Sequence, residues 1–485
     1  MIVYAMKESR RFIFLALLTA IIFTGCGGLN RPKLSPEPTE LPEAWINRPK
    51  DILPASELNT SDLAVWWRQL GDPVLNELVK RTIAGSIDLE SARARVKEAR
   101  ALRGQAKSEL GPSISTSLSA GRSEPLEGTS LSSKSFSGSL DMVWEADLFG
   151  AKRLSLEATQ SDLKAAIEES RAVQVSMIAE TVVAYTDFRV AEERIRVLDK
   201  SLLSQEETTM LTRWREQAGL ASRLEVTQAQ SNLGLTQAEL PLYKQIADEA
   251  RLRLNLLAGE VPGALDDLLT TTKSFTLLPI PPDTVATGIP AEVLRQRPDV
   301  RSAERQLEAS WARLGVAEAG RYPTLKLTGY LDTQSAEFGE LFNLDSVIAN
   351  IVAGLTAPIF DSGRIRENIA IKEAQLEQAA LNYRSIVIQA LSEVELALSS
   401  FRFSQNRIQA LEEAAREAGE AAELAEQRYA AGLVDLLSVL DTQRTLFSIE
   451  DQLAMTKGEY LNAFSTLYRA LGGGWASKAT GASDA

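Results

Sequence analysis

The chain has 485 residues, and its 45% hydrophobic and 24% charged residues are the composition neither of a disordered chain nor of a bundle of membrane helices. A net charge of −13 argues against nucleic-acid binding, which needs clustered Lys and Arg in excess. The lack of histidine and the single cysteine argue against a metal site, an internal disulfide and most catalytic centres, so we expect no enzyme, no metal and no cofactor.

The amino terminus has the pattern of a secretory signal peptide. Basic residues precede an apolar run at 12–24, which is too short to span a bilayer, and Cys26 follows it. The pattern resembles a bacterial lipoprotein signal, in which removal of 1–25 leaves Cys26 as an acylated, palmitate-bearing first residue. An ordinary signal with a chance cysteine is the alternative. We favour lipidation because the sole cysteine falls at the predicted cleavage site, whether translation starts at Met1 or at Met6.

After an extended segment, the body of the chain contains two copies of one sequence pattern. A shift of 211 residues aligns 88–92 with 299–303, Pro112 with Pro323, and Phe149 with Phe360. A shift of 213 aligns 219–220 with 432–433, and we place the gain of two residues near Asp361 and Ser362. So long a period indicates two copies of a large unit. The predicted parts are the signal peptide 1–25, the extended segment 26–65, repeat 1 at 66–258, a linker or equatorial region at 259–297, repeat 2 at 298–475 and a tail at 476–485.

Each copy contains two segments in which apolar and polar residues alternate. The four predicted strands are 113–121, 136–147, 324–332 and 347–358. Such segments are the weak pattern of transmembrane β-strands, although a half-buried strand of a soluble sheet alternates in the same way. Two hairpins cannot close a barrel, and an open edge cannot exist in lipid. If the strands lie in a membrane, three copies of four strands would give a small closed barrel.

The remainder is predicted to be helical and dominated by two long helices, at about 151–217 and 363–430. At 1.5 Å per residue each would be about 100 Å long. A 4-3 spacing of residues that are apolar except for Ser404 marks a coiled-coil seam in the second copy, at Leu376, Ala380, Tyr383, Val387, Ala390, Val394, Ala397, Phe401, Ser404, Ile408, Leu411, Ala415, Ala418, Ala422 and Ala425. A glycine turn and a returning helix follow each long helix, at about 222–258 and 435–471. Shorter helices precede the strands, at about 74–110 and 301–319.

Several motifs, in order, resemble the TolC-like outer-membrane factors, and most of all the OprM- and NodT-type lipoproteins that serve RND efflux pumps. They are Trp66-Trp67 with Gly71-Asp72-Pro73, Arg297-Pro298-Asp299-Val300-Arg301-Ser302-Ala303-Glu304, Ala357-Pro358-Ile359-Phe360 and Leu471-Gly472-Gly473-Gly474-Trp475. The resemblance implies a mostly α fold with a transmembrane β-barrel. In it a homotrimer forms a 12-stranded outer-membrane barrel and a 12-helix periplasmic coiled-coil tunnel.

The same resemblance implies roles for residues near the helical tip. Leu437 and Asp441, one turn apart, match a pore constriction, where three carboxylates would attract cations and exclude anions; a solvated Asp is the alternative. Tyr429 and Glu225 match gating contacts, whereas Val434 stands where some members carry an Arg. Arg444 is expected to pair with Asp441 or with a neighbouring chain. The tip turns expected to dock an adaptor are Gly219, Leu220, Gly432 and Leu433.

The function that follows is a passive, lipid-anchored exit duct in the cell outer membrane for drugs or other small toxic compounds. Its expected partners are a periplasmic adaptor of the membrane-fusion type, an inner-membrane transporter of RND type and outer-membrane lipids, but no nucleic acid. The alternatives are a type I protein secretion duct and a coiled-coil scaffold lipoprotein without a pore. The strand pairs favour a duct, because a scaffold needs none.

Overall fold

The computed structural model describes residues 42–47, 63–124, 133–270, 278–279, 281–282 and 290–475. The predicted signal peptide, Cys26 and the tail at 476–485 lie outside these residues. The chain divides into two compact units, and each draws on both sequence copies. The first unit contains Arg95–Ile167 and Ser302–Ser385, and the second contains Glu40–Ala94, Glu168–Arg301 and Ile386–Ala485.

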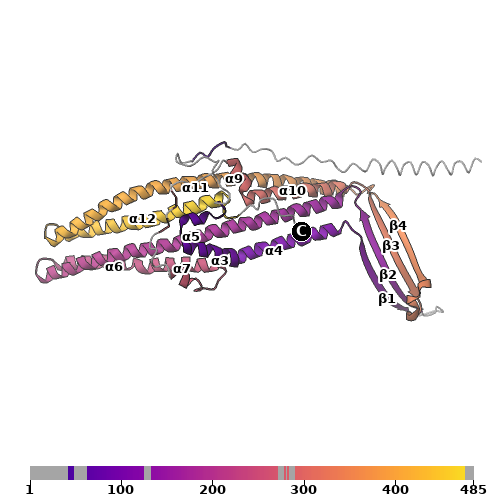
Figure 1. The fold of residues 1–485 in the computed structure, drawn as a ribbon, viewed down its shortest axis with the longest axis horizontal. Coiled ribbons are helices and arrows are strands. Elements are labelled where there is room, and N and C mark those ends of the chain that lie inside the picture. The colour runs from indigo at the N-terminus through magenta and orange to yellow at the C-terminus, as the bar shows by residue number, and fades with distance from the viewer. Residues whose placement is uncertain are drawn as a thin grey trace, which may run out of the picture. The chain divides into compact units, whose positions relative to one another are not determined.

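Helices predominate, and the two longest begin and end within one residue of their predicted bounds (Figure 1). The elements in chain order are η2 (Trp66–Leu70), α3 (Pro73–Gly85), α4 (Ile87–Ser108), β1 (Ser113–Ser123), β2 (Ser133–Ala146), α5 (Ala151–Gln217), α6 (Arg223–Gln237), α7 (Glu239–Ala258), α8 (Asp266–Thr270), α9 (Pro290–Gln296), α10 (Pro298–Ala319), β3 (Thr324–Ser335), η3 (Phe338–Phe342), η4 (Leu344–Ser346), β4 (Val347–Thr356), α11 (Arg364–Ala430) and α12 (Leu436–Ala470).

Two helices predicted as continuous are interrupted. The helix expected at 74–110 breaks at Ser86, between α3 and α4. Beside the break, α3 approaches the end of α7 so closely that a Cβ on Gly85 would lie 2.4 Å from the carbonyl oxygen of Ala258, so only glycine fits there. The helix expected at 222–258 divides into α6 and α7 at Ala238. Pro241 lies three residues further on and has no N–H to donate to the preceding turn, which explains the interruption.

In the first unit, the four strands form one antiparallel sheet in the order β1-β2-β3-β4 (Figure 1). The register places the predicted apolar residues on a common face, at Ile114, Leu118, Leu140, Met142, Trp144, Leu325, Leu327, Leu331, Ile351 and Leu355. The opposite face is mainly polar, and hydroxyls bond across it between Ser117 and Ser139 at 2.9 Å and between Ser119 and Ser137 at 2.7 Å. The sheet therefore has one face suited to lipid and one suited to water.

The strand register corrects the predicted position of the two extra residues. Ser113 pairs with Val143 in the first hairpin, and its counterpart Thr324 pairs with Thr356 in the second. The first strands are thus related by 211 residues and the second strands by 213. The two residues are gained in the connection of the second hairpin and not near Asp361 and Ser362. The alignment of Phe149 with Phe360 at a shift of 211 led to the wrong position, because a sequence alignment contains no information on strand pairing.

The predicted seam is the packed side of α11. Every seam residue except Ala380 is buried or half-buried, and Val394 and Ala397 are almost completely buried. Small and branched side chains at 4-3 spacing let neighbouring helices pack closely along their length. The sequence periodicity therefore located the buried face of the helix correctly.

An aromatic core fixes the second unit; its members are Trp66, Phe401, Tyr460, Phe464 and Tyr468. The Trp66 and Tyr468 rings stack with centroids 5.2 Å apart, and Phe401 stacks on Tyr460 at 4.5 Å. Phe464 is completely buried among them. Asp72, two residues after η2, caps α3 by accepting from the amides of its first turn, and it also accepts a 2.5 Å hydrogen bond from the Tyr185 hydroxyl. The tryptophan pair and the Gly-Asp-Pro motif thus have a structural role: the first is part of the core, and the second joins η2 to the capped start of α3.

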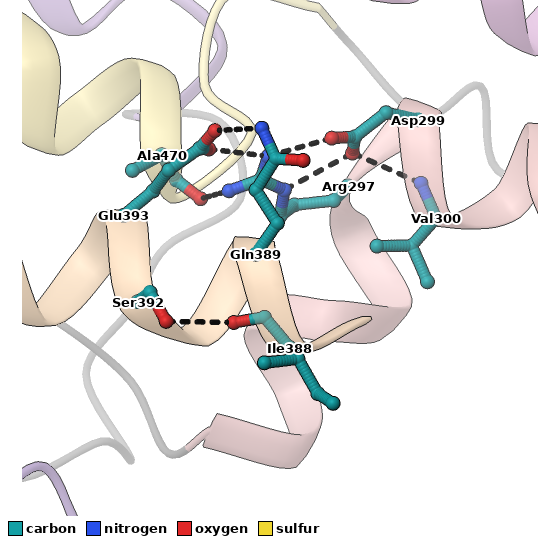
Figure 2. A network of polar contacts seen from close by, with 8 residues as sticks. All are labelled: Arg297, Asp299, Val300, Ile388, Gln389, Ser392, Glu393 and Ala470. Carbon is teal, nitrogen blue, oxygen red and sulfur yellow. Dashed lines mark hydrogen bonds and ion pairs between the residues drawn. The ribbon is translucent and has the colours of Figure 1, made fainter. Parts of the chain in front are cut away.

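Arg297 joins the linker to the start of α10, the middle of α11 and the end of α12 (Figure 2). Its guanidinium binds both carboxylate oxygens of Asp299, a carboxylate oxygen of Glu393 at 2.7 Å and the carbonyl of Ala470 at 2.9 Å. Only 8% of the side chain is exposed. Burial alone would lower the pKa of Arg297, but the hydrogen bonds that its guanidinium donates to Asp299 and Glu393 raise it, so the cation is retained. This network, the Arg297 clamp, was not predicted from the linker sequence.

Candidate functional site

The two helical tips have the same local structure, and Figure 1 shows both at one end of the second unit. Gly219 ends the α5 tip with φ +73°, and Gly432 ends the α11 tip with φ +74°. The amide of the next residue, Leu220 or Leu433, donates to the carbonyl five positions earlier, at 2.7 and 2.9 Å. This is the Schellman arrangement, which needs a left-handed residue and so favours glycine. It leaves both leucines more than 70% exposed on rigid turns.

Each returning helix begins with a polar cap. Ser222 and Glu225 form a capping box, in which the Ser222 amide donates to the Glu225 carboxylate at 2.6 Å and the Glu225 amide donates back to the Ser222 hydroxyl. Glu225 is thus hydrogen-bonded within its own helix. Asp435 caps α12 and accepts from both the hydroxyl and the amide of Ser438. These two hydrogen bonds, the hydroxyl's first, lower the pKa of Asp435.

Tyr429 is buried between the two helical hairpins, α5–α6 and α11–α12. Its hydroxyl lies 3.2 Å from the hydroxyl of Thr212, and the Arg215 guanidinium lies 4.6 Å from its ring centroid. Arg215 also donates to the carbonyl of Tyr429. Around the ring is a small apolar cluster, formed by Ala229, Leu436, Val439 and Leu440. Tyr429 therefore holds the α11 tip against α5 within one chain.

Leu437 and Asp441 lie on the exposed face of α12, one turn apart. Leu437 is 57% exposed, and Asp441 is also exposed. Arg444 donates from Nε to the Asn232 side-chain oxygen at 2.6 Å, and no ion pair joins it to Asp441 among the residues that the structure describes. The predicted constriction pair thus faces away from the chain's own core, where contact with solvent or with another chain is possible.

A polar cluster lies between the helices α5, α11 and α12, close to their tips. We call it the polar seam, and its members are Ser204, Thr208, Glu426 and Gln443. The Gln443 amide nitrogen, which carries two hydrogens, lies within hydrogen-bonding distance of oxygens of all three others, at 2.7 to 2.9 Å. The Ser204 hydroxyl donates to Glu426 at 2.5 Å. Gln443 is only 4% exposed and Thr208 is buried, whereas Ser204 and Glu426 are half-buried.

Several polar atoms around the seam are buried without a partner among the described residues. They are Gln205 Oε1, Thr209 Oγ1, Asn232 Nδ2 and Gln443 Oε1. Each orphaned donor or acceptor costs about 1–3 kcal/mol relative to a satisfied one. The packing of the tip is therefore less favourable than its depth of burial suggests. Sequence reasoning missed this cluster, because its hydrogen bonds join residues that lie far apart in the chain.

Among the described residues there is no group of three or more His, Cys, Asp or Glu side chains that could hold a metal ion. In the same part of the chain, none of the helices is both long and apolar enough to cross a membrane.

A sheet with one apolar face, joined in sequence to paired long helices with rigid tips, contains the parts of an outer-membrane channel with a helical extension. The chain belongs to the family of outer membrane efflux proteins, whose model matches residues 78–260 and 289–473.

Individual relatives and solved structures agree with this family assignment. The chain is 31% identical to the pyoverdine export outer membrane protein OpmQ of Pseudomonas aeruginosa, over 96% of this chain and 98% of that protein. It is 25% identical to the probable outer membrane lipoprotein SilC of Salmonella typhimurium, over 95% and 98%. The structure of the outer-membrane channel OprN is similar, with a TM-score of 0.83, 31% identity and coverage of 92% and 99%. The chain is therefore an outer-membrane channel component of an efflux system, as the sequence motifs predicted, and its family and neighbours are channel proteins rather than enzymes.

Proposed function

We propose that three copies of this chain form a passive duct through which small molecules leave the cell envelope, fed by a periplasmic adaptor and an inner-membrane pump of RND type. The observation that carries this proposal is the sheet, which has an apolar face and two edges with which no strand of the described residues pairs, because such edges exist in lipid only if other chains pair with them. Native mass determination in detergent tests it. We expect three chains, and a monomer would contradict the trimer.

The proposed cargo is a small molecule, since one relative is named for the export of pyoverdine. The test compares a deletion strain with its complemented parent for growth inhibition by small toxic compounds and for secreted proteins. Increased sensitivity with an unchanged set of secreted proteins is expected. A loss of one secreted protein without a change in sensitivity would instead favour protein secretion.

The proposed entrance is a ring of Leu437 and Asp441 from three chains. Both side chains are exposed on one face of α12, and three carboxylates around an axis would favour cations. Asp441→Ala should raise single-channel conductance in lipid bilayers and reduce cation selectivity. Gln228→Ala is the matched control, because Gln228 occupies the same position in the first copy and carries no charge. An unchanged selectivity in Asp441→Ala would exclude the ring.

The proposed docking site for the adaptor consists of the two tip turns. Leu220 and Leu433 are apolar, strongly exposed and held on rigid turns, so an apolar groove on a partner could accept them without loss of chain entropy. Leu220→Ser with Leu433→Ser should reduce adaptor co-purification and efflux while the assembly persists. Leu256→Ser, on the equally exposed Leu256 of α7, is the control and should leave both unchanged.

The proposed anchor is a diacylglyceryl group and an amide-linked acyl chain on Cys26. Labelled palmitate should enter the wild-type chain and not Cys26→Ser, and the variant should keep the ability to form the channel. Equal labelling of both would contradict the anchor.

A further inference from the structure

The proposed assembly does not say how the outer edges of the sheet, β1 and β4, would pair between chains. Both β1 and β4 are exposed along their whole length, and no described strand pairs with the free edge of either. The four strands alternate in direction, so β4 of one chain can pair antiparallel with β1 of the next. Such a head-to-tail contact uses two different surfaces and closes into a ring when the rotation permits.

We infer that β4 of one chain pairs with β1 of the next in a register fixed by the internal repeat, with Thr356 opposite Ser117. This inference rests on the proposed trimer. Within one chain, β2 and β3 form the junction between the first and second copies, and Val143 lies opposite Thr328. A contact between chains is the same kind of junction, because it joins a second copy to a first copy. The known junction therefore serves as a template.

The register follows by moving each template residue to its counterpart. The hairpin pairings relate β2 to β4 by 213 residues, so Val143 corresponds to Thr356. They relate β3 to β1 by 211, so Thr328 corresponds to Ser117. An unbroken repeat of 211 would instead place Thr356 opposite Ser115. The two registers differ by one strand period, so both keep every side chain on its face, and only the strand pairing distinguishes them.

Neighbouring positions support the inferred register on both faces. On the apolar face it sets Leu118, which is 69% exposed, opposite Leu355, which is 54% exposed. Apolar cross-strand pairs stabilise sheets. On the polar face the Ser117 hydroxyl already contacts Ser139 within its chain. A threonine on the other side of Ser117 would extend that row of hydroxyls across the contact between chains.

Paired cysteines test the register in the full-length chain in outer membranes. Under oxidation, Ser117→Cys with Thr356→Cys should give covalent dimers and trimers on a denaturing, non-reducing gel, with nothing larger. Directly opposite residues have Cα atoms about 4.5–5.5 Å apart, within the range of a disulfide. Ser115→Cys with Thr356→Cys is the matched control, because its residues would be diagonal neighbours about 7–8 Å apart. The single variants control for Cys26.

The outcomes separate the register from the trimer. Cross-linking of the Ser117 pair only, ending at the trimer, supports the inference. Cross-linking of the Ser115 pair only overturns this register while leaving the trimer intact. If neither pair cross-links and the native mass is that of three chains, the contact between β4 and β1 is wrong although the proposed assembly stands. A monomeric native mass overturns the assembly itself.

Discussion

The aromatic core and the polar seam are both buried among helices of the second unit, yet they are packed by different forces. Around Phe464 the contacts are mainly apolar, and each large buried side chain contributes about 1.5–3 kcal/mol. Around Gln443 the contacts are hydrogen bonds worth about 0.5–1.5 kcal/mol each, with orphaned atoms close by. Burial alone therefore does not measure stability, and we expect movement to begin at the seam.

The difference has a mechanical meaning. Apolar interdigitation requires one arrangement of side chains, whereas hydroxyl and amide groups can exchange partners with one another or with water at little net change in free energy. A channel that must stay assembled while its entrance opens needs both kinds of packing.

The largest effect is expected from Phe464→Ala. The substitution removes the centre of the aromatic core and leaves a cavity, so unfolding in guanidinium should show a loss of about 3–5 kcal/mol. Leu256→Ala, on the exposed Leu256, is the control and should change stability little. A loss below about 1 kcal/mol for Phe464→Ala would contradict the view that this region is the rigid one.

Arg297→Ala tests whether polarity itself makes a region weak. The Arg297 clamp is polar but is fully partnered, and removal of its cation strands the Glu393 and Asp299 carboxylates, so we expect a loss of about 3 kcal/mol. Arg416→Ala is the control, because that arginine forms an exposed pair with Glu413, and it should change stability little. Equal effects of the two substitutions would rule out a structural role for the clamp.

Gln443→Leu should lose about 1–3 kcal/mol, because the seam groups around Gln443 lose the amide that donates to them. Adding Thr208→Val should recover part of that loss by removing one of the stranded groups. The double variant should also conduct less in bilayers, since an apolar seam resists rearrangement. If conductance rises as stability recovers, the seam does not govern opening.

Tyr429→Phe should cost about 0.5–1.5 kcal/mol, the value of the single hydroxyl contact with Thr212. Channel conductance should rise modestly, because the ring and its contact with Arg215 remain. Thr227→Val, on the exposed Thr227 of α6, is the control. A tightly closed channel with unchanged stability would show that Tyr429 does not restrain the tip.

The smallest effect concerns pH at the start of α12. The folded pKa of Asp435 lies below its ordinary value, so the stability that the cap contributes is fully present above about pH 4 and is lost as the pH falls through the folded pKa. Hydrogen exchange in the first turn of α12 should rise below about pH 4, beyond the intrinsic change of rate. Asp435→Asn should keep the cap without this pH dependence, and an identical profile in both proteins would exclude the mechanism.

Regular features of the chain were predictable, and single contacts were not. The bounds of α5 and α11, the seam and the faces of the four strands followed from periodicity, because burial repeats along an element. The Arg297 clamp and the polar seam join residues far apart in sequence, so no local pattern contains them. The tip turns lie between these cases: their glycines were visible in the sequence, but only the structure shows that both leucines project outward. The roles of Leu437 and Asp441 stay predictions.

The two residues gained in the second hairpin record how the copies have diverged since duplication. The added residues lie in the connection, and the counterpart residues still pair, so every strand position keeps its lipid-facing or water-facing side. Selection can therefore tolerate a length change in this connection as long as the strand pairing is kept. Among natural variants of this protein, length differences should be found in the connections between strands and not within the strands.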